Sequence, residues 1–241
     1  MDTTYFGRQY GIIVLYDSIS KQALFVEEVR YESNALYLEG IRCLQEKCTS
    51  IQSITCNERR GLEKLFPGIP TQLCQFHQMQ IINRYLTRNP KSLAAHELKA
   101  LALTLKNSTQ TGFEAALQAW HEQHEAFLDE RTTNPLTHQS RYPHFRLRSA
   151  CHSLKRNLPH LFTFERYPDL GIHNTTNLLE GRFADLKAKL RCHQGMKKEN
   201  KVRFIKDYFS KKMPARASIL SLRRRELKNS LKVVPYHQKS P

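Results

Sequence analysis

Polar residues with chemically useful side chains follow two short strand-like segments in the middle of the chain. Asn57 comes just after residues 50–55, where apolar side chains alternate, and a second such segment at 71–76 leads to Cys74 and His77. Ligands of open α/β sheets gather at the carboxyl ends of strands. The pattern therefore predicts a site at these strand ends, with Asn57 in the position of a catalytic side chain.

Cys74 and His77 have the spacing of two zinc ligands. A closed zinc site needs four ligands, and the other neighbouring Cys and His residues, at 151–152 and 192–193, are adjacent and lack ligand spacing. The sequence therefore argues against zinc, and the role of the pair stays open.

A second group of candidate metal ligands lies on one predicted helix. His121 and His124 are three residues apart, with Glu122 and Glu125 beside them. This spacing suits a metal site, but a run of charged residues is more often a solvated helix face. We interpret the group as a solvated face.

Glu180 lies near the start of a predicted helix that Asn174 or Thr175 can cap. The apolar residues of this helix recur at intervals of four, three and four and form one stripe, made of Leu179, Phe183, Leu186 and Leu190. Glu180 lies beside that stripe. Its carboxylate can point along the edge of a sheet, or it can merely complement the dipole of the helix.

The elements that must position these residues alternate at first between strands and helices. Up to residue 77 the predicted order is three strands, helix, strand, helix, strand. The bounds are 2–6, 9–16 and 23–29 for the first three strands, 33–48 for the first helix, with Ser33 as its cap, and 58–66 for the second.

Strand signals stop after residue 77, and helical periodicity takes over up to residue 171. The predicted helices are 78–87, 93–106, 112–129 and 141–156. We therefore expect three parts: an α/β core made of residues 1–77 and 172–212, a helical insertion subdomain at 78–171, and a basic helix and tail at 213–241.

The charge of the chain is strongly positive and uneven. The 241 residues carry a net charge of +16, and 17 basic against 4 acidic residues between 182 and 232 account for +13 of it. This excess predicts a polyanionic partner, bound without sequence specificity and with a steep salt dependence. The alternative, a solvated face that keeps the protein soluble, requires less charge. The candidate contacts are Lys187, Lys189, Arg191, Lys197, Lys198, Lys201, Arg203 and Lys206.

Composition also bears on the compartment. With 40% hydrophobic residues the chain can bury a sizeable core, and it contains no signal-peptide pattern and no apolar run of roughly 18 residues. Its six cysteines show no regular framework and are most simply reduced thiols. The expectation is a cytoplasmic protein without a membrane partner.

Three motifs carry a resemblance to a known family. They are DTTYFGRQYGIIVLYD from residue 2, ITCNERRGLEKLFP from residue 54 with QLCQFH from residue 72, and NTTNLLEGRFADLKAKLRCHQG from residue 174. In this order they resemble bacterial insertion-sequence transposases of the DDE class, in the branch similar to Mutator-type transposases. The resemblance covers about residues 2–210. It implies a ribonuclease H-like mixed sheet flanked by helices, with an all-helical insertion before the last core helix.

The resemblance also implies roles for single residues. Asp2, Asn57 and Glu180 correspond to the three catalytic positions, with Asp2 and Glu180 as metal ligands. Three carboxylates there would hold two Mg²⁺ ions roughly 3.5 to 4 Å apart, one activating the attacking hydroxyl or water and one stabilising the leaving oxygen. Cys74 and His77 correspond to a family motif near the active site. The implied partner is double-stranded DNA, both transposon ends and target, without a small-molecule substrate; such transposases commonly work as homo-oligomers.

The chain departs from this family at residue 57, where members have Asp and this sequence has Asn57. An amide can still coordinate, but it removes one negative charge from a site that must hold two divalent ions. We therefore expect weakened metal binding. Glu58 is a conceivable substitute, although a one-residue shift turns a strand side chain to the other face, and Asp17 is better explained as a turn residue.

The beginning of the chain is the other departure. Relatives of this type carry an upstream DNA-recognition region, often a zinc ribbon with a helix-turn-helix, and none precedes Asp2. We expect a truncated chain that lacks the start of its central strand. Two hypotheses follow: a DDE transposase that cuts and joins DNA, impaired in this copy, or a catalytically silent remnant that only binds DNA. An RNA-binding role is less favoured, because the sequence has no stacking motif of the RNA-recognition type.

Overall fold

The first three strands form an antiparallel sheet in the order β1-β2-β3. They are β1 (Asp2–Phe6), β2 (Tyr10–Asp17) and β3 (Gln22–Val29), as predicted. The computed structural model describes residues 1–8, 10–47, 50–59 and 61–210. Strand β2 is central, with Ile13 and Leu15 in the core on one face and Ile12 and Val14 in the core on the other. Burial on both faces explains why this strand is continuously apolar.

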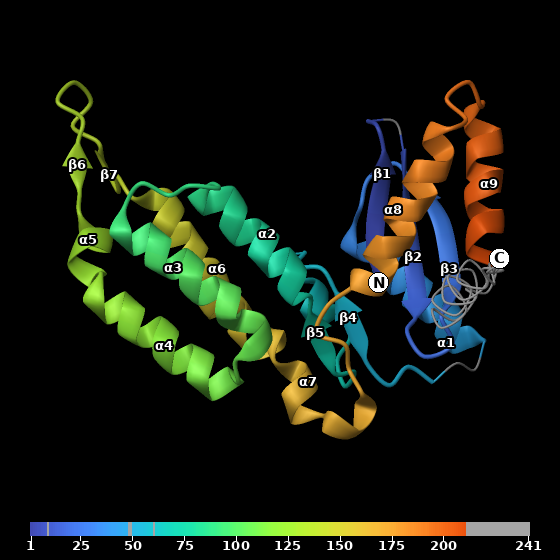
Figure 1. The fold of residues 1–241 in the computed structure, drawn as a ribbon, viewed down its shortest axis with the longest axis horizontal. Helices are drawn as coiled ribbons and strands as arrows, with labels where there is room; N and C mark the ends of the chain where they lie inside the picture. The colour runs from blue at the N-terminus through green and yellow to red at the C-terminus, as the bar shows by residue number, and fades with distance from the viewer. Residues whose placement is uncertain (9, 48–49, 60, 211–241) are drawn as a thin grey trace, which may run out of the picture.

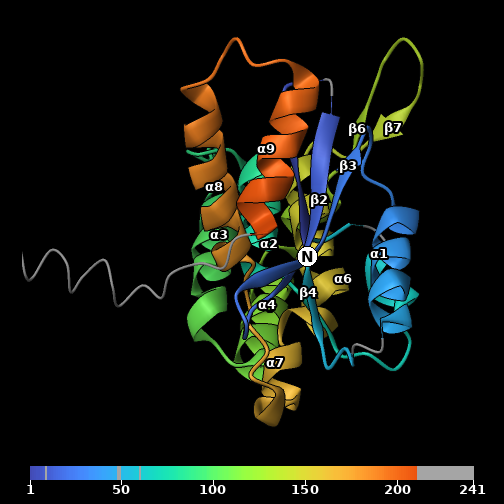
Figure 2. The same ribbon diagram turned by 90° about the vertical axis from the view of Figure 1, so that its right-hand side faces the viewer.

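Helices cover both faces of this sheet (Figures 1 and 2). On one face lies α1 (Asn34–Glu46), which begins after the predicted cap Ser33 and shares a core with Ile13 and Leu15. On the other lie α8 (Asn177–Arg191) and α9 (Lys198–Ser210). The predicted apolar stripe of α8 is confirmed, since all four residues are buried there: Leu179, Phe183, Leu186 and Leu190.

Arg182 of α8 is buried at 4% exposure beneath α9. Its Nη2 donates to the backbone oxygen of Tyr208 at 3.1 Å, and its guanidinium lies 5.0 to 5.5 Å from the ring centroids of Tyr16, Tyr208 and Phe209. Cation–π contacts of this kind favour arginine at partly desolvated sites. They hold α8 and α9 together against β2.

A second, parallel sheet consists of β4 (Ile54–Cys56) and β5 (Thr71–Leu73). The amino group of Met1 donates to the backbone oxygen of Thr55 at 2.6 Å, so β1 and β4 meet at the start of β1. The helix predicted at 58–66 is wrong in extent. Only a short 3₁₀ turn, η1 (Leu62–Leu65), forms there, because Gly61 before it has a left-handed backbone and Pro67-Gly68 follows closely.

Helices dominate the stretch from 75 to 170, as predicted, and lie at the end of the molecule away from α8 and α9 (Figure 1). They are α2 (Gln75–Leu86), α3 (Leu93–Thr104), η2 (Leu105–Asn107), α4 (Gln110–Gln123), α5 (Glu125–Asp129), α6 (Phe145–Leu161), α7 (Thr163–Arg166) and η3 (Pro168–Leu170). Several predicted bounds are wrong. Helix α2 begins at Gln75 rather than 78, and the helix predicted at 112–129 is divided into α4 and α5. Helix α6 begins at Phe145 rather than 141 and runs through Pro159 to Leu161, where Leu158 and Leu161 are held in the core.

The expectation that strands end at residue 77 is also wrong in one place. A short hairpin of β6 (Thr132–Thr133) and β7 (Ser140–Arg141) projects from the helices, with its strands fully exposed. Its turn is built by Asn134, whose side-chain oxygen accepts from the backbone amides of Leu136 and Thr137. Asn side chains stabilise turns in this way, which the strand signal alone does not reveal.

Buried amide groups tie these helices to β5. Gln72 is fully buried, its Nε2 donates to the backbone oxygen of Leu161 at 2.8 Å, and its Oε1 accepts from the amide of Phe164 at 3.1 Å. The side chain of Thr163 donates to the backbone oxygen of Thr71 at 2.8 Å. One hydrophobic core extends from the β1–β3 sheet through β4 and β5 into the helices. The predicted boundary at 77/78 therefore crosses a continuous core.

Among the described residues, no helix is both long and apolar enough to cross a membrane. The basic helix and tail predicted at 213–241 lie outside the described residues.

Candidate functional site

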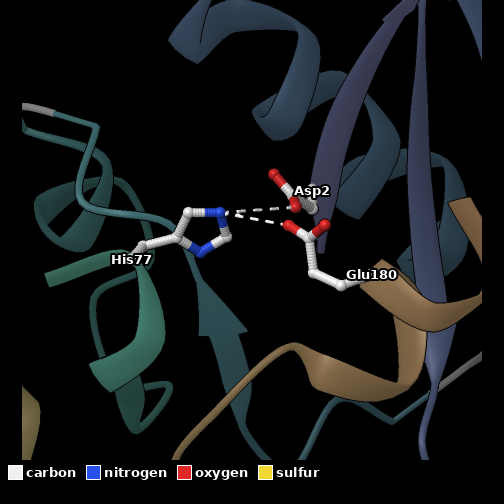
Figure 3. Close-up of side chains that lie close together, drawn as sticks. All are labelled: Asp2, His77 and Glu180. Carbon is white, nitrogen blue, oxygen red and sulfur yellow. Dashed lines mark ion pairs between the residues drawn. The ribbon is translucent and has the colours of Figure 1, made fainter. Parts of the chain in front are cut away.

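Three side chains from distant parts of the chain meet at one point (Figure 3). Asp2 is the first residue of β1, His77 lies in the first turn of α2, and Glu180 lies in the first turn of α8. The Nε2 atom of His77 is 3.2 Å from Glu180 Oε1 and 3.8 Å from Asp2 Oδ2. Their potential ligand atoms all lie within 4.8 Å of one another, so the three side chains could hold a metal ion.

Asn57 follows β4 and lies beside Asp2. Its Nδ2 donates to Asp2 Oδ1 at 3.4 Å and to Glu32 Oε1 at 2.9 Å, while its Oδ1 accepts from the backbone amide of Arg59 at 3.3 Å. Glu32 also accepts from the Tyr37 hydroxyl at 2.6 Å. Asn57 therefore presents its donor side, not its oxygen, to two carboxylates.

The Cys74-x-x-His77 pair connects the two helix N-termini at the site. Both the backbone amide and the hydroxyl of Thr176 donate to Cys74 Sγ, at 3.3 and 3.4 Å, and the hydroxyl lies 3.5 Å from His77 Nδ1. This arrangement directs the opposite ring nitrogen, Nε2, toward Glu180. The role left open for the pair is thus positional: Cys74 anchors the start of α8, and His77 faces the acids.

The capping residue predicted for α8 is wrong by one or two positions. The helix begins after Thr176, not after Asn174 or Thr175, and the Thr176 side chain makes no capping bond because Cys74 engages it. The backbone oxygen of Asn174 instead accepts from the amide of Gln75 at 2.9 Å. This contact with α2 holds the loop before α8 in place and brings Glu180 to Asp2.

Burial and close charges shift the pKa values of the site. Burial raises the pKa of Asp2 to about 7, although His77 opposes this. The hydrogen bond from His77 lowers the pKa of Glu180. For His77, burial alone would lower the pKa, but hydrogen bonds to Cys74 and Glu180 outweigh it and raise the pKa to about 10. At neutral pH an imidazolium thus faces an ionised Glu180.

Burial and hydrogen bonding also act in opposite directions on the pKa of Cys74. Burial alone would raise the pKa of its thiol, but hydrogen bonds with His77 and Thr176 outweigh it, and the pKa is lowered. The sulfur accepts the two bonds from Thr176 more strongly as its thiolate character increases.

Two further acids considered from the sequence lie apart from this cluster. Asp17 ends β2 and accepts from the amides of Ile19 and Ser20, both at 3.0 Å, so it is a turn residue. Glu58 does not belong to the group whose ligand atoms lie within 4.8 Å of one another. Burial raises the pKa of Glu58 to about 8, and its Oε1 has no hydrogen-bond partner among the described residues.

The histidines and glutamates at 121–125 form no joint site. His124 is half-buried and pairs with Glu97 of α3, whereas Glu122 and Glu125 are exposed, as predicted for a solvated face. Glu122 accepts from Gln118 on the same helix at 2.7 Å. The cysteines of the other Cys–His pairs lie apart, with Cys151 buried in α6 and Cys192 exposed after α8.

The cations predicted to contact DNA fall into two sets. Four of them line a groove of about 750 Å³ beside α8 and α9: Lys187, Arg191, Lys198 and Lys201. The others lie outside its lining, where Lys189 pairs with Asp185 and Lys206 lies 3.8 Å from Glu27. Lys197 and Arg203 are exposed. Lys198 also pairs with Glu28 at 2.6 Å.

Sequence reasoning missed Glu32 and the position of His77 against the acids. Glu32 lies in the loop between β3 and α1, two residues before the helix, where acids are common at helix starts and carry no special signal. A signal for His77 did exist. His77 lies in the first turn of a helix that directly follows a strand, at the same sheet edge as Asn57, where ligands gather.

In comparisons with known proteins, no protein-family model matches the chain, and no curated protein is significantly similar to it. What the chain does must therefore be inferred from its own residues.

Proposed function

We propose that this chain is the catalytic region of a DNA transposase of the DDE class, with a ribonuclease H-like fold, and that its activity is impaired by Asn57. One observation carries the proposal. Asp2 and Glu180 are 178 positions apart, yet they meet beside Asn57 at the sheet edge. The motif resemblance names these same three positions.

The arrangement of strands is consistent with this fold. The antiparallel strands run in the order β3-β2-β1, and the contact between Met1 and Thr55 brings the parallel pair β4 and β5 next to β1. The strands thus combine antiparallel and parallel pairing, as the mixed sheet implied by the resemblance requires. The helical stretch from α2 to α7 then stands where the resemblance implies an insertion, before α8 with Glu180.

The two carboxylates of the cluster suit one divalent cation, whereas His77, which carries a proton at Nε2, faces them as a hydrogen-bond donor and not as a ligand. Asp2, His77 and Glu180 have ligand atoms within 4.8 Å of one another. Oxygens on opposite sides of a Mg²⁺ ion are about 4 Å apart, so the cluster has a suitable size. The two negative charges of Asp2 and Glu180 balance the charge of one divalent ion. A second ion lacks its carboxylate, because Asn57 turns amide hydrogens toward Asp2.

Each residue of the site would have its own role. Asp2 and Glu180 would bind Mg²⁺, which when bound neutralises phosphate charge and activates an attacking oxygen. Asn57 orients Asp2 through its hydrogen bond, and Thr176 orients His77. His77 holds a proton at Nε2 against Glu180, which keeps the two acids together. The double-stranded DNA of transposon end and target, and a homo-oligomer that pairs two ends, are part of the proposal.

The second candidate is a catalytically silent protein that only binds DNA. The orientation of Asn57 favours it, because an amide donor lying between Asp2 and Glu32 hydrogen-bonds to both acids and holds them together without a metal ion. The groove with Lys187, Arg191 and Lys201 would remain able to bind phosphates.

The experiment compares the unaltered chain, Asn57→Asp, and Asn57→Asp with Glu180→Gln. Each is incubated with Mg²⁺ or Mn²⁺ and a labelled duplex carrying preformed 3′-ends, and strand joining and nicking are measured. We expect activity in Asn57→Asp at least tenfold above the unaltered chain, and none in the double variant, since one lost catalytic carboxylate costs far more than tenfold. Activity that survives Glu180→Gln would contradict the assignment. Inactivity of all three despite metal binding would favour the silent protein.

A further inference from the structure

A groove lies at the far end of α8 from Glu180, and its lining comes from the residues around the β1–β2 turn and the α8–α9 turn. Its volume is about 750 Å³, and among the described residues its lining contains the cations Lys187, Arg191, Lys198 and Lys201 but no Asp or Glu, although Lys198 pairs with Glu28 beside it. A surface with this charge attracts a polyanion. The same lining holds aromatic rings, which phosphate binding alone does not need.

The groove continues the candidate site along two neighbouring elements. On α8, Glu180, Lys187 and Arg191 lie on one side of the helix, at spacings of seven and four residues. Lys187 is therefore about 10 Å along the axis from Glu180, and the two side chains interact electrostatically. On β1, Asp2 and Phe6 point to the same face because they are an even number of residues apart.

The aromatic rings form a platform at the groove. Phe6 is half-buried and stacks on Tyr10, with ring centroids 5.4 Å apart and planes 23° apart. Tyr10 itself is only 4% exposed, yet its hydroxyl has no hydrogen-bond partner among the described residues. An unpaired buried hydroxyl is costly, and a ligand with an acceptor oxygen would satisfy it.

Rings combined with cations distinguish single strands from duplexes. In a duplex the faces of the bases are stacked inside, so the protein meets only phosphates and base edges. An unpaired base can lie flat against an aromatic ring while its phosphates meet lysine and arginine. The combination of Phe6 with Lys187 and Arg191 therefore suits an unpaired strand.

We propose that this groove holds two or three unpaired nucleotides of the DNA strand that leads to Asp2 and Glu180. Phosphates lie on Lys187, Arg191 and Lys201, and one base stacks on Phe6. The proposal rests on the proposed function for the identity of that strand. It adds that the strand end is opened next to the site.

The test measures binding of a fluorescent eight-nucleotide dT strand by anisotropy, in EDTA so that no metal-dependent step takes part. The same length is offered as duplex DNA and as U-strand RNA. We expect the DNA strand to bind at least about tenfold more tightly than the duplex, as one stacked base allows. Equal or tighter binding of the duplex, or tighter binding of RNA, would overturn the proposal.

Matched variants locate the binding in the groove. Phe6→Leu should weaken single-strand binding about tenfold and leave duplex binding unchanged, whereas Phe145→Leu, at an exposed ring on α6, should change neither. Lys187→Gln should lower the slope of log affinity against log salt by about 0.7, whereas Lys189→Gln on the same helix should not. Thermal melting checks that each variant folds. If Phe6→Leu does not fold, the comparison of Lys187→Gln with Lys189→Gln is decisive. Equal slopes of log affinity against log salt in these two variants would refute the groove proposal.

This result separates the two proposals. If the groove variants bind the single strand as tightly as the unaltered chain does, and Asn57→Asp is active, only the groove proposal is refuted. The opposite result has two parts: the groove variants lose single-strand binding, and Asn57→Asp neither binds metal nor cleaves DNA. That result would refute the proposed enzymatic function and leave the groove proposal standing.

Discussion

At the scale of single residues, the chemistry of the site depends on which atoms Asn57 turns toward Asp2. Its amide nitrogen lies between Asp2 and Glu32 and donates to both. A carboxylate at this position would instead repel both acids, and a cation would be needed to hold the three together. The amide of Asn57 therefore joins the two acids in a hydrogen-bonded network, and we expect a carboxylate at this position to require a cation.

The variant Asn57→Asp tests this directly. We expect its affinity for Mn²⁺ to rise at least about tenfold, because a third carboxylate joins the site, while its melting temperature without metal falls through repulsion from Asp2 and Glu32. Titration calorimetry and thermal melting with and without Mn²⁺ measure both effects. Asn134→Asp, which adds the same charge in the exposed hairpin turn, is the control and should change neither. An unchanged affinity in Asn57→Asp would show that residue 57 is not a metal position.

Thr176 is the second residue whose contacts decide the site. Thr176→Val keeps the shape of the side chain but removes the hydroxyl that meets Cys74 and His77. We expect about 1 kcal/mol less stability and about tenfold weaker Mn²⁺ binding, because the hydroxyl no longer orients His77, which holds the ligand Glu180 in place. Thr175→Val, one position earlier, should leave both quantities unchanged. Identical effects of the two variants would mean that the hydroxyl of Thr176 has no special role.

At the scale of elements, the site is made by two helix starts that face one sheet edge. Helix α2 begins directly after β5, and α8 begins where its preceding loop bonds to the start of α2. Neither start follows from its own cap, because Cys74 and Thr176 use their side chains on each other. The positions of His77 and Glu180 therefore depend on how the two helices are tied to β5.

Gln72 provides one of these ties and can be removed separately. Gln72→Leu leaves the amide of Phe164 without its buried partner, and we expect a loss of about 2 kcal/mol in the free energy of unfolding. Denaturant unfolding measures it. Gln118→Leu, at an exposed position on α4 whose amide only meets Glu122, should change stability by less than about 0.5 kcal/mol. A stable Gln72→Leu would mean that packing alone holds the helices to β5.

At the scale of the whole molecule, sheet and helices share one core, although the sequence suggests an inserted subdomain. Core residues run without interruption from Ile13 and Leu15 in β2 through Leu73 in β5 to Phe162. A shared core predicts cooperative loss of structure in both parts. Among the described residues, positive charge is concentrated in the segment with α8 and α9, since residues 182–210 contain nine basic and three acidic residues, and we expect a polyanion to bind at that end.

Cooperative unfolding can be followed with the single tryptophan of the chain, Trp120 on α4. Its fluorescence reports on the helices, whereas the extent of thiol labelling at buried Cys56, measured on its own peptide by mass spectrometry, reports on β4 as it becomes accessible. We expect both signals to change at the same urea concentration, and Leu73→Ala to lower both midpoints equally. Two separate midpoints would instead favour an independent subdomain at 78–171.

The sequence by itself determined the order of the strands β1 to β5 and of the main helices, the apolar stripe of α8 and the strand ends at which polar residues gather. These features are local: periodicity and capping depend on neighbouring residues, and they located Asp2, Asn57 and Glu180 once the motifs were recognised. The short 3₁₀ turn, the true start of α8 and the place of Glu32 could not be predicted in this way.

Only the tertiary structure decided that His77 faces both acids, that Asn57 offers donors rather than its oxygen, and that some lysines line a groove while others pair with acids. The physical reason is that these facts depend on contacts between residues about 20 to 180 positions apart. Hydrogen-bond direction and burial at such contacts are set by packing, and neither has a signature in the local sequence.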